Sequence, residues 1–587
     1  MKVLLTAINA KYIHSNLAVY SLKSFAGKYG NEIEIAEFTI NNYTDEILKR
    51  IYKRQPDVVA FSCYIWNIEM VLELVELLNR VLPGTDIWLG GPEVSYDART
   101  CLVNYPHVKG IMRGEGEETF LELMAYYHKE QGAFLEKILG LTFRDVSGAV
   151  VENPPRPVMD MSRIPFVYDD LGHFKNKIIY YESSRGCPFS CSYCLSSIDK
   201  KVRFRDMEMV KAELLHFIKA GIPQVKFVDR TFNCSHLRAR EIWTFLRDND
   251  LGRTNFHFEV AADLMDDESL EILKTLRPGL IQLEIGVQST CPETIHEIRR
   301  TMDFGKVSQV VGRINEGHNI HQHLDLIAGL PYENLERFRK SFDDVYALRP
   351  DQLQLGFLKV LKGSYMHERR QAYGLIHTPK APYEVLSTQW MDYGEIIHLK
   401  SVEEMVEVYY NSHQFDASVA YLEHFYKRPI ELFEDLAAYY EAEGLFEVSH
   451  SRMGRYDILR NFVCERKWGS LETFQELLIY DLYLRENLKS RPSWSADPKV
   501  DKRFYLEFYN NEEDLRAYLT GYDGYDCKQI RKMTHVEHFT VDIKKSVEQG
   551  RAAPNDHYIL FDYKNRDPLT YESKTVYIGK ETNDKDS

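Results

Sequence analysis

The stretch Ser184-Arg185-Gly186-Cys187-Pro188-Phe189-Ser190-Cys191-Ser192-Tyr193-Cys194 places three cysteines in one short loop, with C-x3-C-x2-C spacing. Soft thiolate ligands suit iron–sulfur clusters, and three of them can hold three irons of a cubane. The fourth iron then stays open for a substrate or cofactor. The alternatives are three unrelated thiols or a structural zinc loop, but zinc normally takes four ligands and no second C-x2-C pair is present. The spacing therefore predicts a [4Fe-4S] cluster on Cys187, Cys191 and Cys194.

The sequence around this loop alternates between predicted strands and helices. A strand at residues 178–182 leads into the loop, and five further strands follow at 224–228, 256–261, 280–285, 322–328 and 352–361. Helices are predicted at 207–220, 235–249, 267–276, 291–302 and 335–348. Six such steps predict a partial parallel (β/α)6 barrel over residues 178–370, and the sites of parallel barrels lie at the C-terminal ends of the strands.

The first 130 residues show a second alternation. Strands are predicted at 3–8, 32–39, 58–63, 87–89 and 108–112, with helices at 16–28, 44–54 and 68–81 between them. Nearly continuous apolar strands separated by helices are typical of a doubly wound parallel sheet, so this is an α/β domain. Ligands of such sheets bind at the carboxyl ends of the strands, and two glycine-rich turns, at 90–92 and 113–117, fall there.

The remaining segments are less regular. Residues 131–177 are predicted to be a connector with a hairpin at 141–143 and 149–151, because Asn153-Pro154-Pro155-Arg156-Pro157 interrupts regular structure. Residues 371–587 are predicted to form a mostly helical extension, with a break at 492–498, strands at 539–543, 557–563 and 573–578, and a frayed tail at 581–587.

Composition limits the class of partner. The chain has 587 residues, 44% of them hydrophobic, and a formal net charge of −15. An acidic surface disfavours broad binding to nucleic acid or to an anionic membrane. Six of the nine cysteines are scattered, and no stretch is long and apolar enough for a signal peptide or a membrane helix. We therefore expect a cytoplasmic protein in a reducing compartment.

Several short motifs accompany the cysteine triplet in a fixed order. They are Phe61-Ser62, Gly90-Gly91-Pro92, Arg113-Gly114-Glu115-Gly116-Glu117, Val228-Asp229-Arg230-Thr231-Phe232-Asn233, Gly286-Val287-Gln288-Ser289, Leu326-Ile327-Ala328-Gly329-Leu330-Pro331 and Leu358-Lys359-Val360-Leu361-Lys362-Gly363. With them, residues 1–370 resemble the cobalamin-binding radical S-adenosylmethionine (SAM) enzymes. In that family a flavodoxin-like B12-binding domain precedes the radical SAM barrel. The region after 370 resembles an extension of unassigned function found in one branch.

The resemblance implies three cofactors: a [4Fe-4S] cluster, SAM and cobalamin. In the first domain it implies cobalamin contacts at Ser62, Gly90, Gly91, Gly114, Glu115 and Gly116. Glycine at such turns lets the backbone approach a bulky ligand closely. No G-x-G-x-x-G follows the first strand, which disfavours a dinucleotide. Well-known B12 domains carry Asp-x-His-x-x-Gly with a cobalt-ligating His; His14 has neither the Asp nor the Gly, so we expect that it does not bind cobalt.

In the barrel, SAM would be oriented by polar residues at the strand ends. The predicted SAM contacts are Asp229, Asn233, Glu259, Gln288, Ser289 and Arg300. An arginine there would pair with the SAM carboxylate, since arginine forms bidentate pairs with carboxylates. Each of these residues is alternatively a strand-end polar residue satisfied within the protein.

The resemblance implies a methyltransferase that acts at an unactivated carbon through a 5′-deoxyadenosyl radical, with methyl carried on the corrinoid. The alternatives are corrinoid-assisted cyclisation, ring rearrangement or electron transfer, and a non-catalytic cluster or corrinoid binder. A methylthiotransferase needs three N-terminal cysteines, and only Cys63 and Cys101 precede the triplet. The expected partners are a substrate, small or macromolecular, and a low-potential electron donor such as flavodoxin or ferredoxin.

Overall fold

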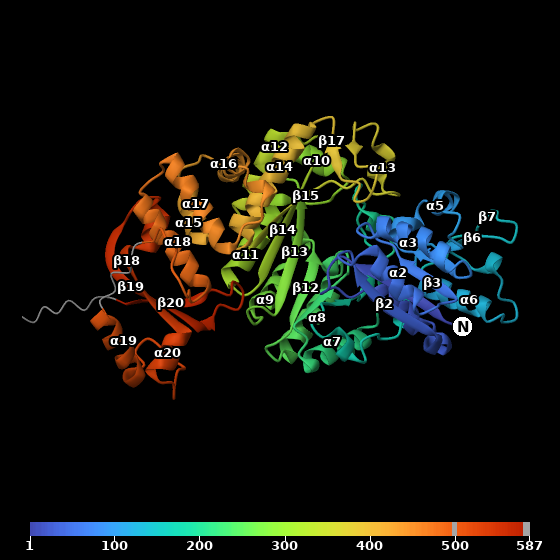
Figure 1. Cartoon of the computed structure of the whole chain (residues 1–587), viewed down its shortest axis with the longest axis horizontal. Helices are drawn as coiled ribbons and strands as arrows, with labels where there is room; N and C mark the ends of the chain where they lie inside the picture. Colours follow the sequence, from blue (N-terminus) through green and yellow to red (C-terminus); the bar gives the residue numbers. More distant parts are fainter. Residues whose placement is uncertain (496–501, 579–587) are drawn as a thin grey trace, which may run out of the picture. The chain divides into compact units, whose positions relative to one another are not determined.

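The computed structural model describes residues 1–495 and 502–578, in two compact units (Figure 1). The first unit comprises Met1–Leu335 and Gly356–Tyr393, and the second contains Glu336–Leu355 and the described residues from Gly394 onward. Within the described residues no helix has the length and apolar character that crossing a bilayer requires.

The first sheet confirms the predicted doubly wound architecture. Five parallel strands have the order β2-β1-β3-β4-β5, which is the flavodoxin order. Their bounds are β1 Val3–Asn9, β2 Ile33–Thr39, β3 Val58–Ser62, β4 Asp86–Gly90 and β5 Gly110–Met112. The main helices beside them are α1 Leu17–Phe25, α2 Thr44–Tyr52, α3 Ile68–Val81, α5 Ala98–Asn104 and α6 Glu117–Tyr127.

Alternate residues of β1 explain why this sheet is covered on both faces. Leu4 and Ile8 belong to a core that includes residues of α2, α3 and α5. Val3 and Leu5 belong to the opposite core, which includes residues of α1 and α6. Successive side chains of a strand point to opposite faces, so one apolar run supplies both cores.

The predicted hairpin in residues 131–177 is confirmed, and it extends the first sheet. β6 (Leu141–Arg144) pairs antiparallel with β5 and with β7 (Val150–Glu152). The sequence indicated the hairpin but not the strand against which it would pack.

The second sheet contains the six predicted strands, in the order β15-β14-β13-β12-β11-β8. The bounds are β8 Ile179–Tyr181, β11 Gln224–Phe227, β12 Asn255–Val260, β13 Ile281–Gln288, β14 His321–Ala328 and β15 Gln352–Phe357. Between them run α7 Met207–Ala220, α8 His236–Asn249, α9 Asp267–Lys274, α10 Pro292–Glu297, α11 Phe304–Gly317 and α12 Leu335–Tyr346. Parallel pairing is recorded from β8 through β14, as expected for a partial barrel.

One helix of the barrel was not predicted. The sequence indicated a single helix at 291–302, but α10 ends at Glu297 and α11 begins at Phe304. Asp303 caps α11 by accepting from the backbone N–H of Lys306, and α11 buries Val307, Val311 and Ile314. Its first residue, Phe304, is followed at once by Gly305, and glycine lowers helix propensity, which made this helix hard to recognise.

The second unit is mostly helical, as predicted. Its helices include α14 Tyr393–Val406, α15 Asp416–Glu423, α16 Pro429–Ala442, α17 Arg452–Arg466 and α18 Leu471–Arg485. The three predicted strands form one antiparallel sheet, β18 Thr534–Val541, β19 Pro554–Arg566 and β20 Ser573–Ile578. Part of the predicted break, from residue 496, and the predicted tail at 581–587 lie outside the described residues.

Candidate functional site

The three cysteines lie in the loop that leaves β8 of the second sheet. Cys187 and Cys191 are buried, and Cys194 is half-buried. A short antiparallel pair, β9 (Ser184–Arg185) with β10 (Arg203–Phe204), closes the base of the loop. All three thiols are free, so they are available as ligands.

Backbone contacts fix the conformation of this loop. The N–H of Cys187 donates to the Asp199 carbonyl at 3.0 Å, and that of Ser192 donates to the Ile298 carbonyl at 2.8 Å. Gly186 has φ +88°, and a Cβ there would lie 2.5 Å from the Lys201 carbonyl oxygen. Only glycine fits both the left-handed conformation and this close approach. The Arg185-Gly186 pair is therefore part of what shapes the cluster loop.

The thiols fit a cubane better than a single metal ion. In residues 1–495 and 502–578, no three His, Cys, Asp or Glu side chains converge on one ion position. Zinc would require such convergence on one tetrahedral centre, whereas cubane thiolates bind separate irons. Burial raises the pKa of Cys191, and the guanidinium of Arg300 opposes this rise. Arg300 Nη1 lies 3.8 Å from the Cys191 sulfur, where a cation favours the thiolate.

Two predicted SAM contacts lie next to this loop. Each has a buried polar atom that forms no hydrogen bond within the protein. These atoms are Gln288 Oε1 and Arg300 Nε, and Ser192 Oγ in the loop is a third. Gln288 also has φ +72°, a sparsely populated conformation for a residue with a side chain. Such conformations cluster at functional sites, and buried polar atoms usually find a hydrogen-bond partner. This end of β13 therefore fits a polar ligand such as SAM.

The other predicted SAM contacts are engaged within the protein to different degrees. Asp229 accepts from the Ser183 N–H and from the hydroxyls of Ser183 and Ser184, so it anchors the strand that enters the cysteine loop. Asn233 exchanges two hydrogen bonds with the backbone of Ala261. The hydroxyl of Ser289 donates to Glu333 at 2.7 Å. Glu259 lies on the inner face of β12, and none of the described residues lies within hydrogen-bond or ion-pair distance of its carboxyl group.

The carboxyl ends of the first sheet carry the predicted cobalamin contacts. Ser62 ends β3 and accepts from the Asn16 side chain at 3.2 Å. Gly90 ends β4, and Gly91 follows with φ +113°. A Cβ on Gly91 would lie 2.5 Å from the Cys63 carbonyl oxygen, so this glycine is required by the packing of the two strand ends.

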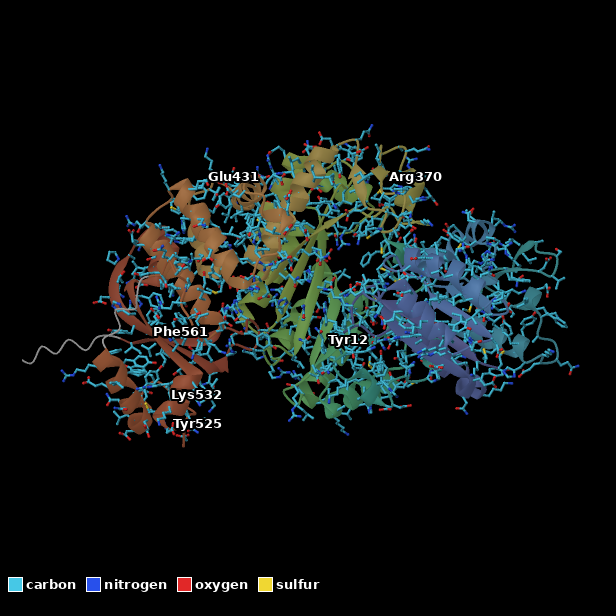
Figure 2. All side chains as sticks on the ribbon, in the orientation of Figure 1. Tyr12, Arg370, Glu431, Tyr525, Lys532 and Phe561 are labelled. Atoms are coloured by element: carbon cyan, nitrogen blue, oxygen red, sulfur yellow. The ribbon has the colours of Figure 1, made fainter. Side chains whose placement is uncertain are left out.

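Large hydrophobic side chains remain exposed at the same strand ends. Tyr12 (71% exposed) and Ile13 follow β1, Trp66 (43% exposed) follows β3, and Tyr96 follows β4. Tyr12 is labelled in Figure 2, with Lys177 Nζ 5.9 Å from its ring centroid. These side chains place apolar surface on loops that follow three neighbouring strands, beside the predicted cobalamin contacts. A corrin ring, which is large and mostly apolar, fits such a surface.

Ion pairs join the predicted cobalamin loop to the cysteine loop. Glu115 Oε1 lies 2.8 Å from Arg203 Nη2 on β10, and its other oxygen accepts from the Met159 N–H at 3.0 Å. Glu117 accepts from Arg185 at 2.5 Å. Gly114 has open space around it, and Gly116 packs against Leu22. Arg185 and Arg203 could not be predicted from the sequence as part of the site, because their partners Glu117 and Glu115 are far away in the chain.

The His14 ring has an orienting partner from the barrel, although the Asp of the cobalt-ligating motif is missing. Its Nδ1 lies 2.5 Å from the hydroxyl oxygen of Tyr180 on β8, and the His14 backbone forms a β-bridge with Ile178. Burial lowers the pKa of His14, and Lys11 and Lys226 lower it further. The hydroxyl of Tyr180 thus orients the His14 ring, and no local motif could indicate this contact between residues that are far apart in the sequence.

A strap formed by residues 356–393, which follow β15, contacts both halves of the first unit. The Met366 N–H donates to the carbonyl of Ser192 in the cysteine loop at 2.8 Å. Tyr383 donates to Glu93, and Lys362 Nζ lies 3.0 Å from Asp97. Glu93 and Asp97 both follow β4 of the first sheet. Arg370, labelled in Figure 2, belongs to the strap. The sequence signal for this strap was only the Lys359-to-Gly363 motif.

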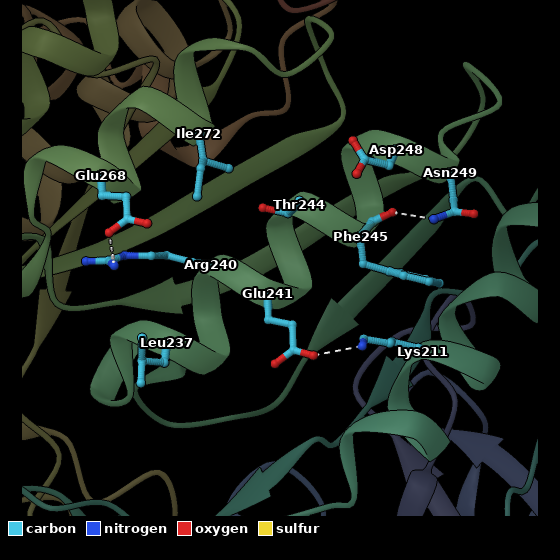
Figure 3. Close-up of a pocket in the computed structure, with 10 residues that line it drawn as sticks. All are labelled: Lys211, Leu237, Arg240, Glu241, Thr244, Phe245, Asp248, Asn249, Glu268 and Ile272. Atoms are coloured by element: carbon cyan, nitrogen blue, oxygen red, sulfur yellow. Dashed lines mark hydrogen bonds and ion pairs between the residues drawn. The ribbon is translucent and has the colours of Figure 1, made fainter.

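A groove of about 440 Å³ lies on the outside of the barrel, along α7, α8 and α9 (Figure 3). Its charged side chains pair with one another: Lys211 with Glu241 at 2.7 Å, and Arg240 with Glu268. Among the described residues that line it, none has a buried polar atom without a hydrogen-bond partner. It is not the candidate site.

Three families match consecutive parts of the chain. Residues 3–124 match the B12 binding domain, residues 181–345 match the radical SAM superfamily, and residues 371–561 match a protein family of unknown function, DUF4080.

Two curated relatives and one solved structure illustrate the likeness. The uncharacterized methyltransferase PH0819 of Pyrococcus horikoshii is 26% identical over 67% of this chain and 83% of its own length. The cobalamin-dependent radical SAM methyltransferase TokK of Streptomyces tokunonensis is 26% identical over 56% of this chain, but only about half (51%) of TokK is matched. The cobalamin-dependent SAM radical enzyme OxsB, solved with aqua-cobalamin and SAM bound, superimposes with a TM-score of 0.58 at 16% identity, covering 81% of this chain and 78% of that one.

The sheet order, the cysteine loop and the three matches agree with one another. The chain therefore combines a B12-binding domain, a radical SAM domain and a DUF4080 C-terminal region, in that order.

Proposed function

We propose that this chain is a cobalamin-dependent radical SAM enzyme that transfers a methyl group to an unactivated carbon. The observation that carries the proposal is the tie between Glu115 and Arg203, with Glu117 and Arg185 beside it. These ion pairs hold the loop after β5 against the strand pair that closes the cysteine loop. A corrinoid at the first sheet and SAM at the cluster would then face one reaction space.

The chain's own residues have distinct parts in this proposal. Cys187, Cys191 and Cys194 would hold the cluster, and Gln288 and Arg300 would orient SAM through their unpaired atoms. When bound, SAM and the corrinoid supply the radical and the methyl carrier. The protein contributes positioning and the exclusion of water and oxygen.

Tyr96 supports the placing of the two cofactors side by side. It follows β4 of the first sheet, and burial raises its pKa, with Cys194 and Asp199 adding to the rise. A residue at the corrinoid-binding edge therefore lies within electrostatic range of a cluster ligand. The ring also packs over Gly363 of the strap, where a Cβ would lie 2.5 Å from the Tyr96 ring.

A radical SAM enzyme requires a substrate and a reductant, and we propose a low-potential flavodoxin or ferredoxin as the electron donor. We place the reaction in the reducing environment of the cytoplasm. All nine cysteines are free, which agrees with that environment.

Reductive cleavage of SAM tests the enzyme assignment. Anaerobically reconstituted protein given a low-potential reductant should release 5′-deoxyadenosine, slowly even without substrate. The Arg300→Gln variant should bind SAM more weakly and keep its iron. Cluster-loaded protein that binds SAM but never cleaves it would instead support a non-catalytic cluster or corrinoid binder.

A further inference from the structure

The two faces of the barrel sheet differ sharply in chemistry. On β12, Phe256, Phe258 and Val260 are buried on the helix-covered face, and they alternate with Asn255, His257 and Glu259. The same alternation continues on β13 and β14, where apolar residues alternate with Gln282, Glu284, His323 and Asp325. Successive residues of a strand point to opposite faces. The inner face is therefore polar and ionisable rather than an apolar core.

Strand register brings these side chains into two adjacent rows. Tyr180, Lys226, His257 and Gln282 are successive partners across β8, β11, β12 and β13. Glu259 is opposite Glu284, and Glu284 is opposite His323, across β12, β13 and β14. Residues directly opposite one another on neighbouring strands are close enough for their side chains to interact.

Most groups in these rows have a partner on the same face. Lys226 Nζ lies 3.0 Å and His257 Nε2 lies 2.9 Å from the same oxygen of Glu284. His323 Nε2 lies 3.0 Å from Asp325 Oδ1. Glu259, which is half-buried, has no such partner among the described residues.

Charges on this face do not balance. Glu259, Glu284 and Asp325 supply three carboxyl groups, and Lys226 is the one lysine among the described residues of these rows, with Arg230 after β11 also within electrostatic range of Glu259. The two imidazoles, of His257 and His323, are already engaged with Glu284 and Asp325. A ligand that carries its own positive charge would pair with Glu259, whereas an anion would be repelled by these three carboxyl groups.

We propose that the inner face of the barrel binds a basic nitrogen of the substrate, with the Glu259 carboxylate as its counter-ion and Asp325 close by. This inference rests on the proposed function and narrows its substrate to compounds with an amine or guanidine. A buried charge is accepted only when it is paired, so the pairing favours a cationic substrate over its neutral analogue.

The state of Glu259 without ligand agrees with this role. Burial raises its pKa to about 7, Arg230 and Lys226 act against the rise, and Glu284 and Asp325 add to it. At pH 7 the free carboxyl is then about half protonated, and a bound cation would drive the proton off.

Calorimetry with a matched set of probes tests the proposal on cluster-loaded protein saturated with SAM. The probes are n-butylamine, n-butanol and butyrate, at physiological salt. We expect butylammonium alone to bind, with one site per chain, and to release about half a proton per molecule at pH 7, measured from titrations in buffers of different ionisation enthalpy. Glu259→Gln should abolish the proton release and weaken binding at least about tenfold.

Two further variants keep the test decisive. Asp325→Asn should weaken binding while keeping the proton release, which covers the case in which Glu259→Gln fails to fold. Glu241→Gln, in the outer groove of Figure 3, should change neither quantity. Equal binding of butanol, or unchanged binding in both inner-face variants, would overturn the proposal. So would binding that occurs only without SAM, because Glu259 would then serve the SAM amine. If one of these contradicting results is obtained while SAM is still cleaved, the proposed function stands and only the assignment of an amine or guanidine substrate is refuted.

Discussion

Arg203 Nη2 lies 2.8 Å from Glu115 Oε1, and this ion pair joins the strand that closes the cysteine loop to the loop after β5 of the first sheet. Both side chains are largely shielded from solvent, so salt screens this contact less than it would screen a surface ion pair. It explains how two sheets built from separate parts of the sequence can present one site.

The cluster assignment predicts iron content. Reconstituted wild-type protein should hold about four irons and four sulfides per chain, as a cubane requires. A Cys187→Ala, Cys191→Ala, Cys194→Ala triple variant should lose them. The exposed Cys464→Ala variant should keep them, and equal iron in the triple variant would refute the ligand set.

The shape of the cysteine loop predicts a difference between two glycines. Gly186→Ala would place a Cβ 2.5 Å from the Lys201 carbonyl oxygen, whereas Gly252→Ala, also at positive φ, meets nothing within 4 Å. Overpacking costs about 1–3 kcal/mol beyond the shared conformational strain. We expect a lower thermal transition temperature and lower iron retention for Gly186→Ala alone. Equal losses in both variants would show that the positive φ, and not the close contact with Lys201, makes glycine necessary at residue 186.

Glu259 predicts a pH dependence of stability. Its native pKa of about 7 exceeds the ordinary glutamate value, so between roughly pH 4.3 and 7 the native state binds more protons than the unfolded state. The contribution of Glu259 to the free energy of unfolding is fully present below about pH 4.3 and is lost as the pH rises through 7. The loss is at most about 1.4 kcal/mol per pH unit. Glu259→Gln should therefore lose less thermal stability than wild type between pH 5.5 and 8. Parallel pH profiles would contradict a buried, protonated Glu259.

The sequence around His14 predicts the electronic state of bound cobalt. Although Tyr180 contacts its Nδ1, His14 lacks the Asp and the Gly of the cobalt-ligating motif, so we expect no protein nitrogen on cobalt(II). Its electron paramagnetic resonance spectrum should lack nitrogen superhyperfine splitting. Splitting that disappears in His14→Ala but persists in His107→Ala would show that His14 is a ligand after all.

Much of the fold could be predicted from the sequence, because both sheets have apolar strands separated by helices of ordinary length. The boundaries of α3 and α7 were predicted without error, and their apolar residues recur at helical spacing. Helix α11 was missed because its capping residue, Asp303, lies just after the end of the single helix that was predicted there.

The site could be predicted only where its residues are adjacent in sequence. The cysteine triplet is local, so its spacing was sufficient. The partners Arg203 and Glu115 are far apart in the chain, as are His14 and Tyr180, and only the fold brings each pair together. The same is true of Glu259 and Glu284, whose relationship depends on the register of β12 and β13. Side-chain pairs of this kind are set by tertiary packing, which no short pattern contains.

Methyl transfer from SAM to the corrinoid tests the central claim most directly. Protein loaded with its cluster and with hydroxocobalamin would be incubated anaerobically with a low-potential reductant and SAM labelled with carbon-13 in the methyl group. We predict S-adenosylhomocysteine as a product and carbon-13 in the corrinoid fraction, both absent when cobalamin is omitted. Release of 5′-deoxyadenosine with no label in the corrinoid would contradict the methyltransferase assignment and indicate corrinoid-assisted chemistry without methyl transfer.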